Sequence, residues 1–223
     1  MKNSIVTLEL LPSKGYSPLM EILAATFNRH KIDELRPVLP GHRLLSPADA
    51  GIDPMEIDEN GSDYFANALI KAKALYDKAG MPTLADDSGL SVLALDGAPG
   101  IHSSRYGSLD GSKKLSDGDR NELLLNVMKQ VDERRCAFYC CLVFLYGEDR
   151  YIAVQETCPG LLAYAPAGKG GFGYDPLVFL PELGKTVAEL SPEEKNHISH
   201  RGRAGRAMAA MLKVLEKSLE KKR

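Results

Sequence analysis

The sequence predicts an α/β fold with a mixed central sheet flanked by helices. In the first half of the chain, apolar segments of strand length alternate with segments of helical periodicity. In the second half, a long apolar run with a central turn is typical of a hairpin. Alternation favours parallel strands and a hairpin is antiparallel, so the sheet is expected to be mixed. The 223 residues suffice for one domain or two closely packed lobes.

Two helices are predicted in the first half. The segment EILAATFN, residues 21–28, predicts a short buried strand that runs into a turn. The next segment, RHKIDELRPVL, carries apolar residues at helical spacing, namely Ile32, Leu35 and Leu39. Residues 63–80 predict the second helix, which ends at Gly80. Its expected inward face consists of Leu69, Ala72, Leu75, Tyr76 and Ala79.

Two adjacent carboxylates follow in PTLADDSGLSVLAL, residues 82–95. TLADD and LSVLAL each predict a short strand, which places Asp86 and Asp87 at a strand end before a Ser-Gly turn. Adjacent carboxylates raise each other's pKa unless a cation or a set of donors holds both ionised. The segment alone leaves two interpretations open, a solvated turn and a functional site.

The second half predicts a helix, a hairpin and a C-terminal helix. Residues 119–131 have amphipathic spacing through Leu123, Leu124, Val127, Met128 and Val131. Residues 136–156 predict a hairpin that turns at residues 147–149. The tail from Gly202 onward indicates a helix docked on the core. Its apolar face gathers Met208, Met211, Leu212, Leu215 and Leu219.

Composition argues against several classes of protein. The net charge of −2, with Lys and Arg dispersed, argues against a nucleic acid polymer as partner. No apolar run reaches the roughly 18 residues that span a bilayer, and the first twenty residues make a poor signal peptide, so a cytoplasmic protein is expected. The four cysteines lack zinc-site spacing and are expected to be reduced core residues. A P-loop is absent because Phe179 stands where its first glycine would be, and the dinucleotide fingerprint is absent too.

Three further segments carry groups suited to a phosphorylated ligand. The turn with Thr26 and Asn28 precedes a helix whose first turn carries Lys31, a natural phosphate site, although Asn28 could be only a helix cap. Residues 166–176, PAGKGGFGYDP, combine glycines with aromatic rings that could stack on a base; an ordinary flexible loop is the alternative. Residues 193–204 are either a ligand-binding cluster or a solvated basic turn. Their donors are Lys195, His197, His200, Arg201 and Arg203.

Together these segments resemble the inosine/xanthosine triphosphate pyrophosphatase family, whose members remove noncanonical purine nucleoside triphosphates from the nucleotide pool. The matches run in the family's order from Leu23 to Ala207. They are T-x-N-x-x-K-x-x-E (Thr26, Asn28, Lys31, Glu34), ENG with NALIKAKA, LADDSGLSVLALDGAPGIHSSRY, GKGGFGYDPLVFLPELGKTVAEL and EEKNHISHRGRA. The chain departs from the family's usual pattern at Ala66 and Ala167, where an acidic residue and an arginine are common.

The resemblance implies two lobes around a nucleotide-binding cleft. It implies one enzymatic domain at residues 22–223 after an N-terminal extension at residues 1–21, and a homodimer. The implied reaction is hydrolysis of ITP, dITP or XTP between the α- and β-phosphates, which gives the nucleoside monophosphate and pyrophosphate. Mg²⁺ is the expected cofactor, because a cation offsets the negative charge of the triphosphate.

The resemblance also implies roles for individual residues. Asp87 is the expected catalytic residue, as the base or metal-held activator of water. Asp58, Glu59 and Asp86 are expected to hold the metal with it. The expected substrate-binding residues are Thr26, Phe27, Asn28, Arg29, His30, Lys31, Ser88, Phe172, Gly173, Tyr174, Asp175, Lys195, His200 and Arg201.

Within that set, the segment 26–31 is expected to hold the phosphates and residues 172–175 to grip the sugar and base. His200, Arg201 and backbone N–H groups near Phe172 are expected to donate to the 6-keto oxygen of the base. Two alternatives stay open: a nucleotide-binding regulator without turnover, and a phosphatase that removes single phosphates.

Overall fold

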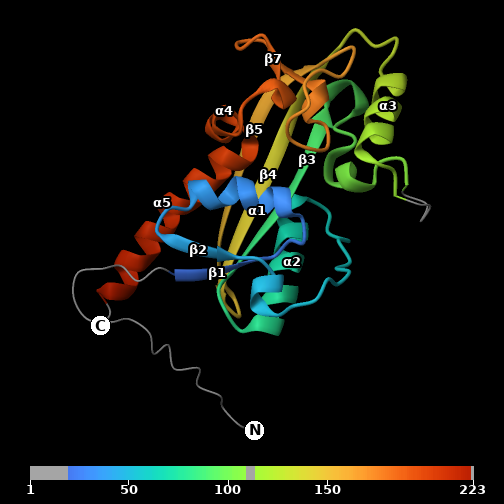
Figure 1. Cartoon of the computed structure of the whole chain (residues 1–223). Coiled ribbons are helices and arrows are strands. Elements are labelled where there is room, and N and C mark those ends of the chain that lie inside the picture. The colour runs from blue at the N-terminus through green and yellow to red at the C-terminus, as the bar shows by residue number, and fades with distance from the viewer. Residues whose placement is uncertain (1–19, 109–113, 222–223) are drawn as a thin grey trace.

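The computed structural model describes residues 20–108 and 114–221. Within them, seven strands form one sheet in the order β2-β1-β3-β4-β5-β6-β7 (Figure 1). The strands are β1 (Met20–Ala24), β2 (His42–Leu45), β3 (Thr83–Val92), β4 (Arg135–Gly147), β5 (Arg150–Leu162), β6 (Val178–Leu180) and β7 (Lys185–Thr186). β1 pairs in parallel with β2 and β3, and the later pairings are antiparallel, which confirms the mixed sheet. The expected N-terminal extension lies outside the described residues up to position 19, and its last two residues begin β1.

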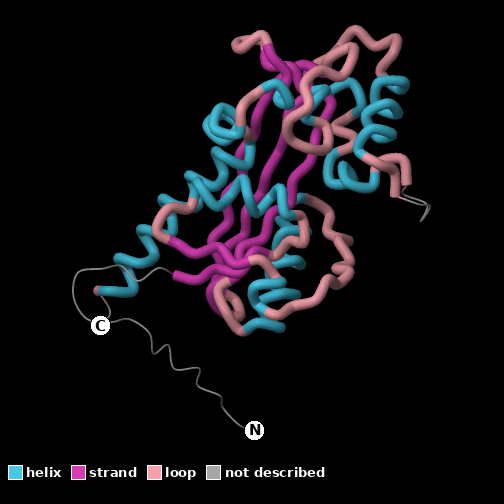
Figure 2. Tube along the Cα trace, viewed as in Figure 1, coloured by secondary structure: helices cyan, strands magenta, loops and turns pink. Residues whose placement is uncertain are grey.

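Helices cover both faces of this sheet (Figure 2). They are α1 (Arg29–Leu35), α2 (Tyr64–Ala79), α3 (Asp117–Val127), α4 (Pro192–Ile198) and α5 (His200–Glu220). Figure 1 shows α2 near the end of the sheet formed by β1 and β2, and α3 near the opposite end. No helix in the described ranges combines the length and hydrophobicity needed to span a bilayer.

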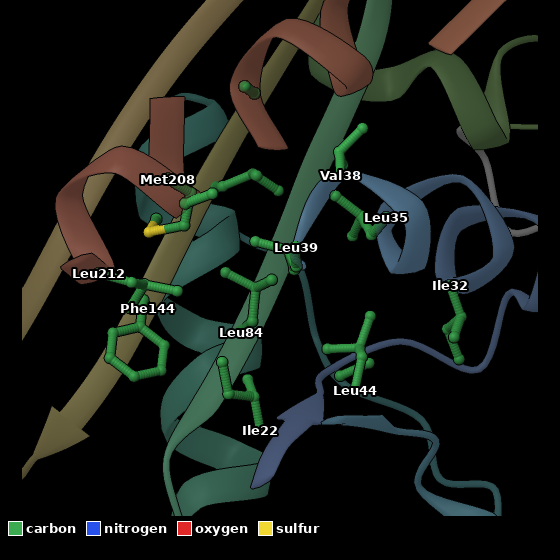
Figure 3. Close-up of a cluster of buried hydrophobic side chains, with 14 of the residues drawn as sticks. Ile22, Ile32, Leu35, Val38, Leu39, Leu44, Leu84, Phe144, Met208 and Leu212 are labelled. Carbon is green, nitrogen blue, oxygen red and sulfur yellow. The ribbon is translucent and has the colours of Figure 1, made fainter. Parts of the chain in front are cut away.

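Alternation along the strands divides the core between the two faces. Leu142 and Phe144 of β4 pack with Met208 and Leu212 of α5 and with residues of α1. Figure 3 shows Phe144 beside Met208 and Leu212. The intervening residues of β4 pack against α2 on the other face. The predicted hairpin is confirmed, because β4 and β5 pair along nearly their whole length. The four cysteines are buried and free, as predicted.

The expectation of two short strands around a Ser-Gly turn is wrong. β3 is one continuous strand of ten residues, so Asp86 and Asp87 lie in its middle. Ser88 and Gly89 continue the pairing with β4, which supplies ladder partners for their backbone groups. Glycine at position 89 lets the backbone around Gly100 approach β3 closely, since a Cβ at Gly89 would lie 2.2 Å from the carbonyl oxygen of Gly100.

The predicted helices are confirmed, with differences at their surfaces. α2 ends at Gly80, which adopts the left-handed conformation that favours glycine. Three residues assigned to apolar faces are instead exposed: Val127 at the end of α3, and Met211 and Leu219 of α5. The sheet and α1 cover only part of the apolar face predicted for α5. The buried part of that face is the side that carries Met208 and Leu212.

We expect Leu212→Ala to lower the free energy of unfolding by about 2–5 kcal/mol, because the side chain is fully buried and its loss leaves a cavity. Met211→Ala is the matched control on the same helix, since Met211 is 43% exposed, and it should change stability by no more than about 0.5 kcal/mol. Urea denaturation of both variants measures the difference. Equal losses would show that α5 does not dock in this orientation.

Candidate active site

Two adjoining cavities lie beside the middle of β3. One, of about 330 Å³, is lined by aromatic rings and is called here the aromatic cavity. Its rings belong to His30, Phe138, Phe172, Tyr174 and His200. The other, of about 300 Å³, contains Glu59, Lys71 and Asp87 and is called the charged cavity. The two share lining residues, namely Asn28, Lys31, Ser88, Ser104 and Lys114.

The adjacent carboxylates of β3 have separate surroundings, because successive residues of a strand point to opposite faces. Asp86 is fully buried and lines neither cavity. Its carboxylate accepts hydrogen bonds from Nε of Arg201 at 2.7 Å and from Nζ of Lys31 at 2.5 Å. Burial by itself would raise the pKa of Asp86, but these two cations hold it well below the usual range. Asp86 is therefore an ionised, fully paired structural group.

Asp86 belongs to a larger cluster that we call the ion network. Its six members are Lys31, Glu34, Asp86, Asp175, Lys195 and Arg201. Nη1 of Arg201 lies 2.6 Å from Glu34, and Nζ of Lys195 lies 2.6 Å from both Glu34 and Asp175. Three carboxylates thus neutralise three cations and join α1, β3, α4, α5 and the segment around Asp175.

The donors of Arg201 are committed within the protein. Besides Asp86 and Glu34, its Nη2 donates to Oγ of Ser88 at 2.7 Å. The interpretation of residues 193–204 as a solvated turn is wrong, because Lys195, His200 and Arg201 are buried. Arg201 was expected to donate to the base, but Asp86, Glu34 and Ser88 already accept hydrogen bonds from its guanidinium.

Asp87 faces the charged cavity and is less completely paired. Its Oδ1 accepts from Nζ of Lys71 at 2.5 Å, and the same ammonium lies 3.1 Å from Glu59. The second carboxylate oxygen, Oδ2, is buried without a hydrogen-bond partner. Burial raises the pKa of Asp87 to about 6, although Lys71 acts in the opposite direction. In Asp87, Oδ1 is therefore held by Lys71, whereas Oδ2 has no partner within the protein and could accept a proton or bind a cation.

The expected site of four metal-binding carboxylates is not assembled. Within residues 20–108 and 114–221, no three His, Cys, Asp or Glu side chains are grouped to hold a metal by themselves. Asp86 lies on the opposite face of β3, and the exposed Asp58 accepts a hydrogen bond from Asn60. Asp87 and Glu59 remain, and this pair fits Mg²⁺, which is commonly held by one or two carboxylates together with substrate phosphates. The unpartnered Oδ2 of Asp87 supports that fit.

The aromatic cavity is bordered by residues 171–175, called here the aromatic loop. The ring of Phe172 stacks on His30 with centroids 5.3 Å apart, and Nζ of Lys195 lies 4.9 Å from its centroid. Asp175 fixes the loop by accepting from the N–H of Phe172 at 2.8 Å and from Lys195. Gly171, one of the two glycines of the loop with positive φ, leaves room for this carboxylate, since a Cβ at position 171 would collide with it.

His200 forms another wall of the aromatic cavity. Its ring stacks on Phe138 with centroids 4.7 Å apart. Burial, reinforced by the neighbouring Arg201, lowers the pKa of His200 well below its usual value, so the imidazole is neutral. Its Nδ1 is buried without a hydrogen-bond partner. A neutral imidazole offers one donor and one acceptor, and the unpartnered Nδ1 leaves one of these two groups for a ligand.

Most of the expected substrate-binding residues line the two cavities. Those in the charged cavity are Thr26, Phe27, Asn28, Lys31 and Ser88. Those in the aromatic cavity are Asn28, His30, Lys31, Ser88, Phe172, Gly173, Tyr174, Asp175, His200 and Arg201. Lys195 lies in the ion network, and Arg29, with a side chain that is 91% exposed, lines neither cavity.

Sequence reasoning did not assign Lys71, Ser104, Lys114 or Phe138 to the site. Lys71 carries a signal that could have been read, because it lies on the buried side of α2, four residues after the buried Asn67. Two polar residues at this spacing on an otherwise apolar helix face indicate a site beneath the helix. Ser104 lies in a short 3-10 helix, Gly100–Arg105, and Lys114 lies in an irregular segment; in neither does residue spacing carry such a signal.

Comparisons with known sequences give matches along most of the chain. A model of the Ham1 family matches residues 22–211. The dITP/XTP pyrophosphatase of Treponema denticola is 50% identical over 185 residues, which cover 83% of this chain and 94% of that protein. The dITP/XTP pyrophosphatase of Pectobacterium atrosepticum is 42% identical over 200 residues, which cover 87% of this chain and 99% of that protein.

Solved structures give the same result for the fold. The Staphylococcus aureus Ham1 protein superposes with a TM-score of 0.76 at 35% identity, over 86% of this chain and 98% of that chain. A Ham1 protein from Coxiella burnetii superposes with a TM-score of 0.77 at 35% identity, over 87% of this chain and 99% of that chain. Because the family model matches most of its length, residues 22–211, this chain belongs to the Ham1 family.

Proposed function

We propose that this chain hydrolyses noncanonical purine nucleoside triphosphates, namely ITP, dITP and XTP, to the nucleoside monophosphate and pyrophosphate. One observation carries the proposal: the aromatic cavity and the charged cavity adjoin at Lys31 and Ser88. A purine nucleotide has the same division, with a flat base at one end and a polyanion at the other. The names of the relatives, dITP/XTP pyrophosphatases, support this substrate class.

The charged cavity supplies the groups for phosphate hydrolysis. Lys31 and the backbone of residues 26–30 would bind phosphate oxygens, since α1 begins there and Lys31 lines the cavity. Ionised Asp87 would accept a proton from the attacking water at Oδ2, while Lys71 holds Oδ1 and fixes the orientation of the carboxylate. Asp87 and Glu59 would hold Mg²⁺, which when bound neutralises charge on the phosphates.

The aromatic cavity supplies the base site. Phe172 and Phe138 offer ring faces for a purine, and His200 offers a neutral donor beside them. Inosine and xanthosine carry a 6-keto acceptor where adenine carries a 6-amino donor. A buried donor facing adenine would stay unpaired, at a cost of about 1–3 kcal/mol. Since the donors of Arg201 have partners within the protein, His200 is the better candidate for reading this position.

Product analysis with ITP, dITP, XTP and the common triphosphates in the presence of Mg²⁺ tests the proposal. Release of pyrophosphate, with preference for the first three, supports it. Release of orthophosphate would identify a phosphatase that removes single phosphates. Nucleotide binding without any product would identify a regulator, and either of these results contradicts the proposed reaction.

Two properties implied by the family resemblance are also proposed here. The first is a homodimer, and a solution mass of one chain, 24.3 kDa, would contradict it. The second is a cytoplasmic location, and recovery of the native protein in a membrane or secreted fraction would contradict that.

We expect Asp87→Asn to lower kcat by at least about 100-fold while nucleotide binding is largely kept. The substitution keeps the size of the side chain but removes the charge that accepts a proton and holds a cation. Asp58→Asn is the matched control, because Asp58 is exposed and lines neither cavity, and it should retain kcat within about threefold. Steady-state rates and calorimetric binding of ITP measure both. Near-normal turnover of Asp87→Asn would refute its catalytic role.

We expect His200→Phe to lower kcat/KM for ITP by about tenfold and to change kcat/KM for ATP by less than about threefold. Phenylalanine keeps the stacking on Phe138 and removes the ring donor. His197→Phe serves as the control, since His197 is exposed on the preceding helix and should leave both constants unchanged. An unchanged ITP-to-ATP ratio in His200→Phe would show that the 6-keto group is read elsewhere.

A further inference from the structure

Gly173, at the centre of the aromatic loop, is held through both of its backbone polar groups by one helix. Its N–H donates to Oδ2 of Asp117 at 2.6 Å. Its carbonyl oxygen accepts from Nδ2 of Asn121 at 3.0 Å. Asp117 and Asn121 are four residues apart in α3, so they lie one above the other on the same helix face. We call this pair of contacts the α3 clamp.

The clamp is built on side chains that are themselves fixed. Asn121 is only 7% exposed and its hydrogen bond is partly buried, whereas the side chain of Asp117 is 50% exposed. The carboxylate of Asp117 pairs with Arg120, which is 6% exposed and also donates to the carbonyl oxygen of Leu115 at 2.6 Å. A capping box at Ser116 caps the N-terminus of α3, next to Asp117. The first turns of α3 are therefore a rigid support.

The clamp acts at the junction between two rings that line the aromatic cavity. Gly173 lies between Phe172 and Tyr174 and adopts a φ of +62°, a backbone conformation that few residues other than glycine adopt readily. The far end of the loop is fixed by Asp175 and Lys195 of the ion network. Without the clamp, the loop would still be anchored at Asp175, by the stacking of Phe172 on His30, and by the buried Tyr174, whose hydroxyl donates to the carbonyl oxygen of Ser103 at 3.1 Å. Phe172 is therefore the ring that could turn away from the cavity.

We propose that Asp117 and Asn121 are positioning residues that set the aromatic loop for the purine base. This inference rests on the proposed function, because it assigns the base to the aromatic cavity. Asp117 lines that cavity, and no residue of α3 lines the charged cavity. Loss of the clamp therefore weakens binding of the nucleoside part of the substrate and leaves binding of the triphosphate part unchanged.

The central test is Asn121→Asp, which keeps the shape of the side chain but places an acceptor against the Gly173 carbonyl. We expect KM for ITP to rise about tenfold, kcat to stay within about twofold, and the inhibition constant of inorganic tripolyphosphate to stay unchanged. Asn126→Asp is the matched control, since Asn126 is exposed on the same helix and undergoes the same change of charge. Asp117→Ala should act like Asn121→Asp, and Asp117→Asn, which keeps an acceptor oxygen, should largely restore KM.

Amide hydrogen exchange of the peptide that contains residues 171–175, measured on the ligand-free protein, reports the clamp without any need for activity. We expect faster exchange in Asn121→Asp and Asp117→Ala than in wild type and Asn126→Asp. Unchanged exchange and an unchanged KM for ITP in Asn121→Asp would overturn the inference. An equal rise of KM and of the tripolyphosphate constant would also overturn it, because it would indicate general damage. If wild type does not hydrolyse ITP, the proposed reaction fails, whereas the exchange result still decides whether the clamp exists.

Discussion

The pairing of Arg201 with Asp86 is the interaction on which the rest of the site depends. Arg201 is almost completely buried, and a guanidinium in that position is tolerated only when carboxylates surround it. Asp86 and Glu34 supply that charge, and Lys195 extends the pairing to Asp175. The ion network thereby fixes the start of α5, the helix α1 and the aromatic loop relative to the middle of β3. Both cavities are bounded by parts that this network holds together.

The two adjacent carboxylates of β3 divide structural and chemical work between them. On one face, Asp86 is surrounded by cations and its pKa is depressed, so it stays ionised and inert. On the other face, Asp87 has one cationic partner, an unpartnered oxygen and a pKa raised to about 6 by burial. Successive side chains of a strand point to opposite faces of the sheet. Two carboxylates that are adjacent in sequence therefore lie in environments that differ in solvation and in neighbouring charge.

The sequence predicted the mixed sheet, the long hairpin and the helices, and most of the substrate-binding residues expected from it line the two cavities. It failed at β3, because turn-forming residues such as Ser88 and Gly89 remain in a strand when β4 supplies their backbone partners. It also grouped Asp86 with the metal-binding residues, since linear order does not reveal which face is occupied by Arg201. Lys71 and the contacts of Asn121 were missed because long-range partners at Asp87 and Gly173 decide their roles. Local pattern identified the elements, whereas contacts between distant segments determined the chemistry.

A double-mutant cycle between Asp86 and Arg201 tests the central claim most directly. The variants are Asp86→Asn, Arg201→Met and their combination, and methionine is chosen because it retains much of the apolar stem of arginine. The account predicts that each single substitution lowers the free energy of unfolding by about 3–5 kcal/mol, because a buried charge loses its partner, and that the double variant loses clearly less than the sum. Small and additive losses would contradict the claim that this ion pair holds the site together.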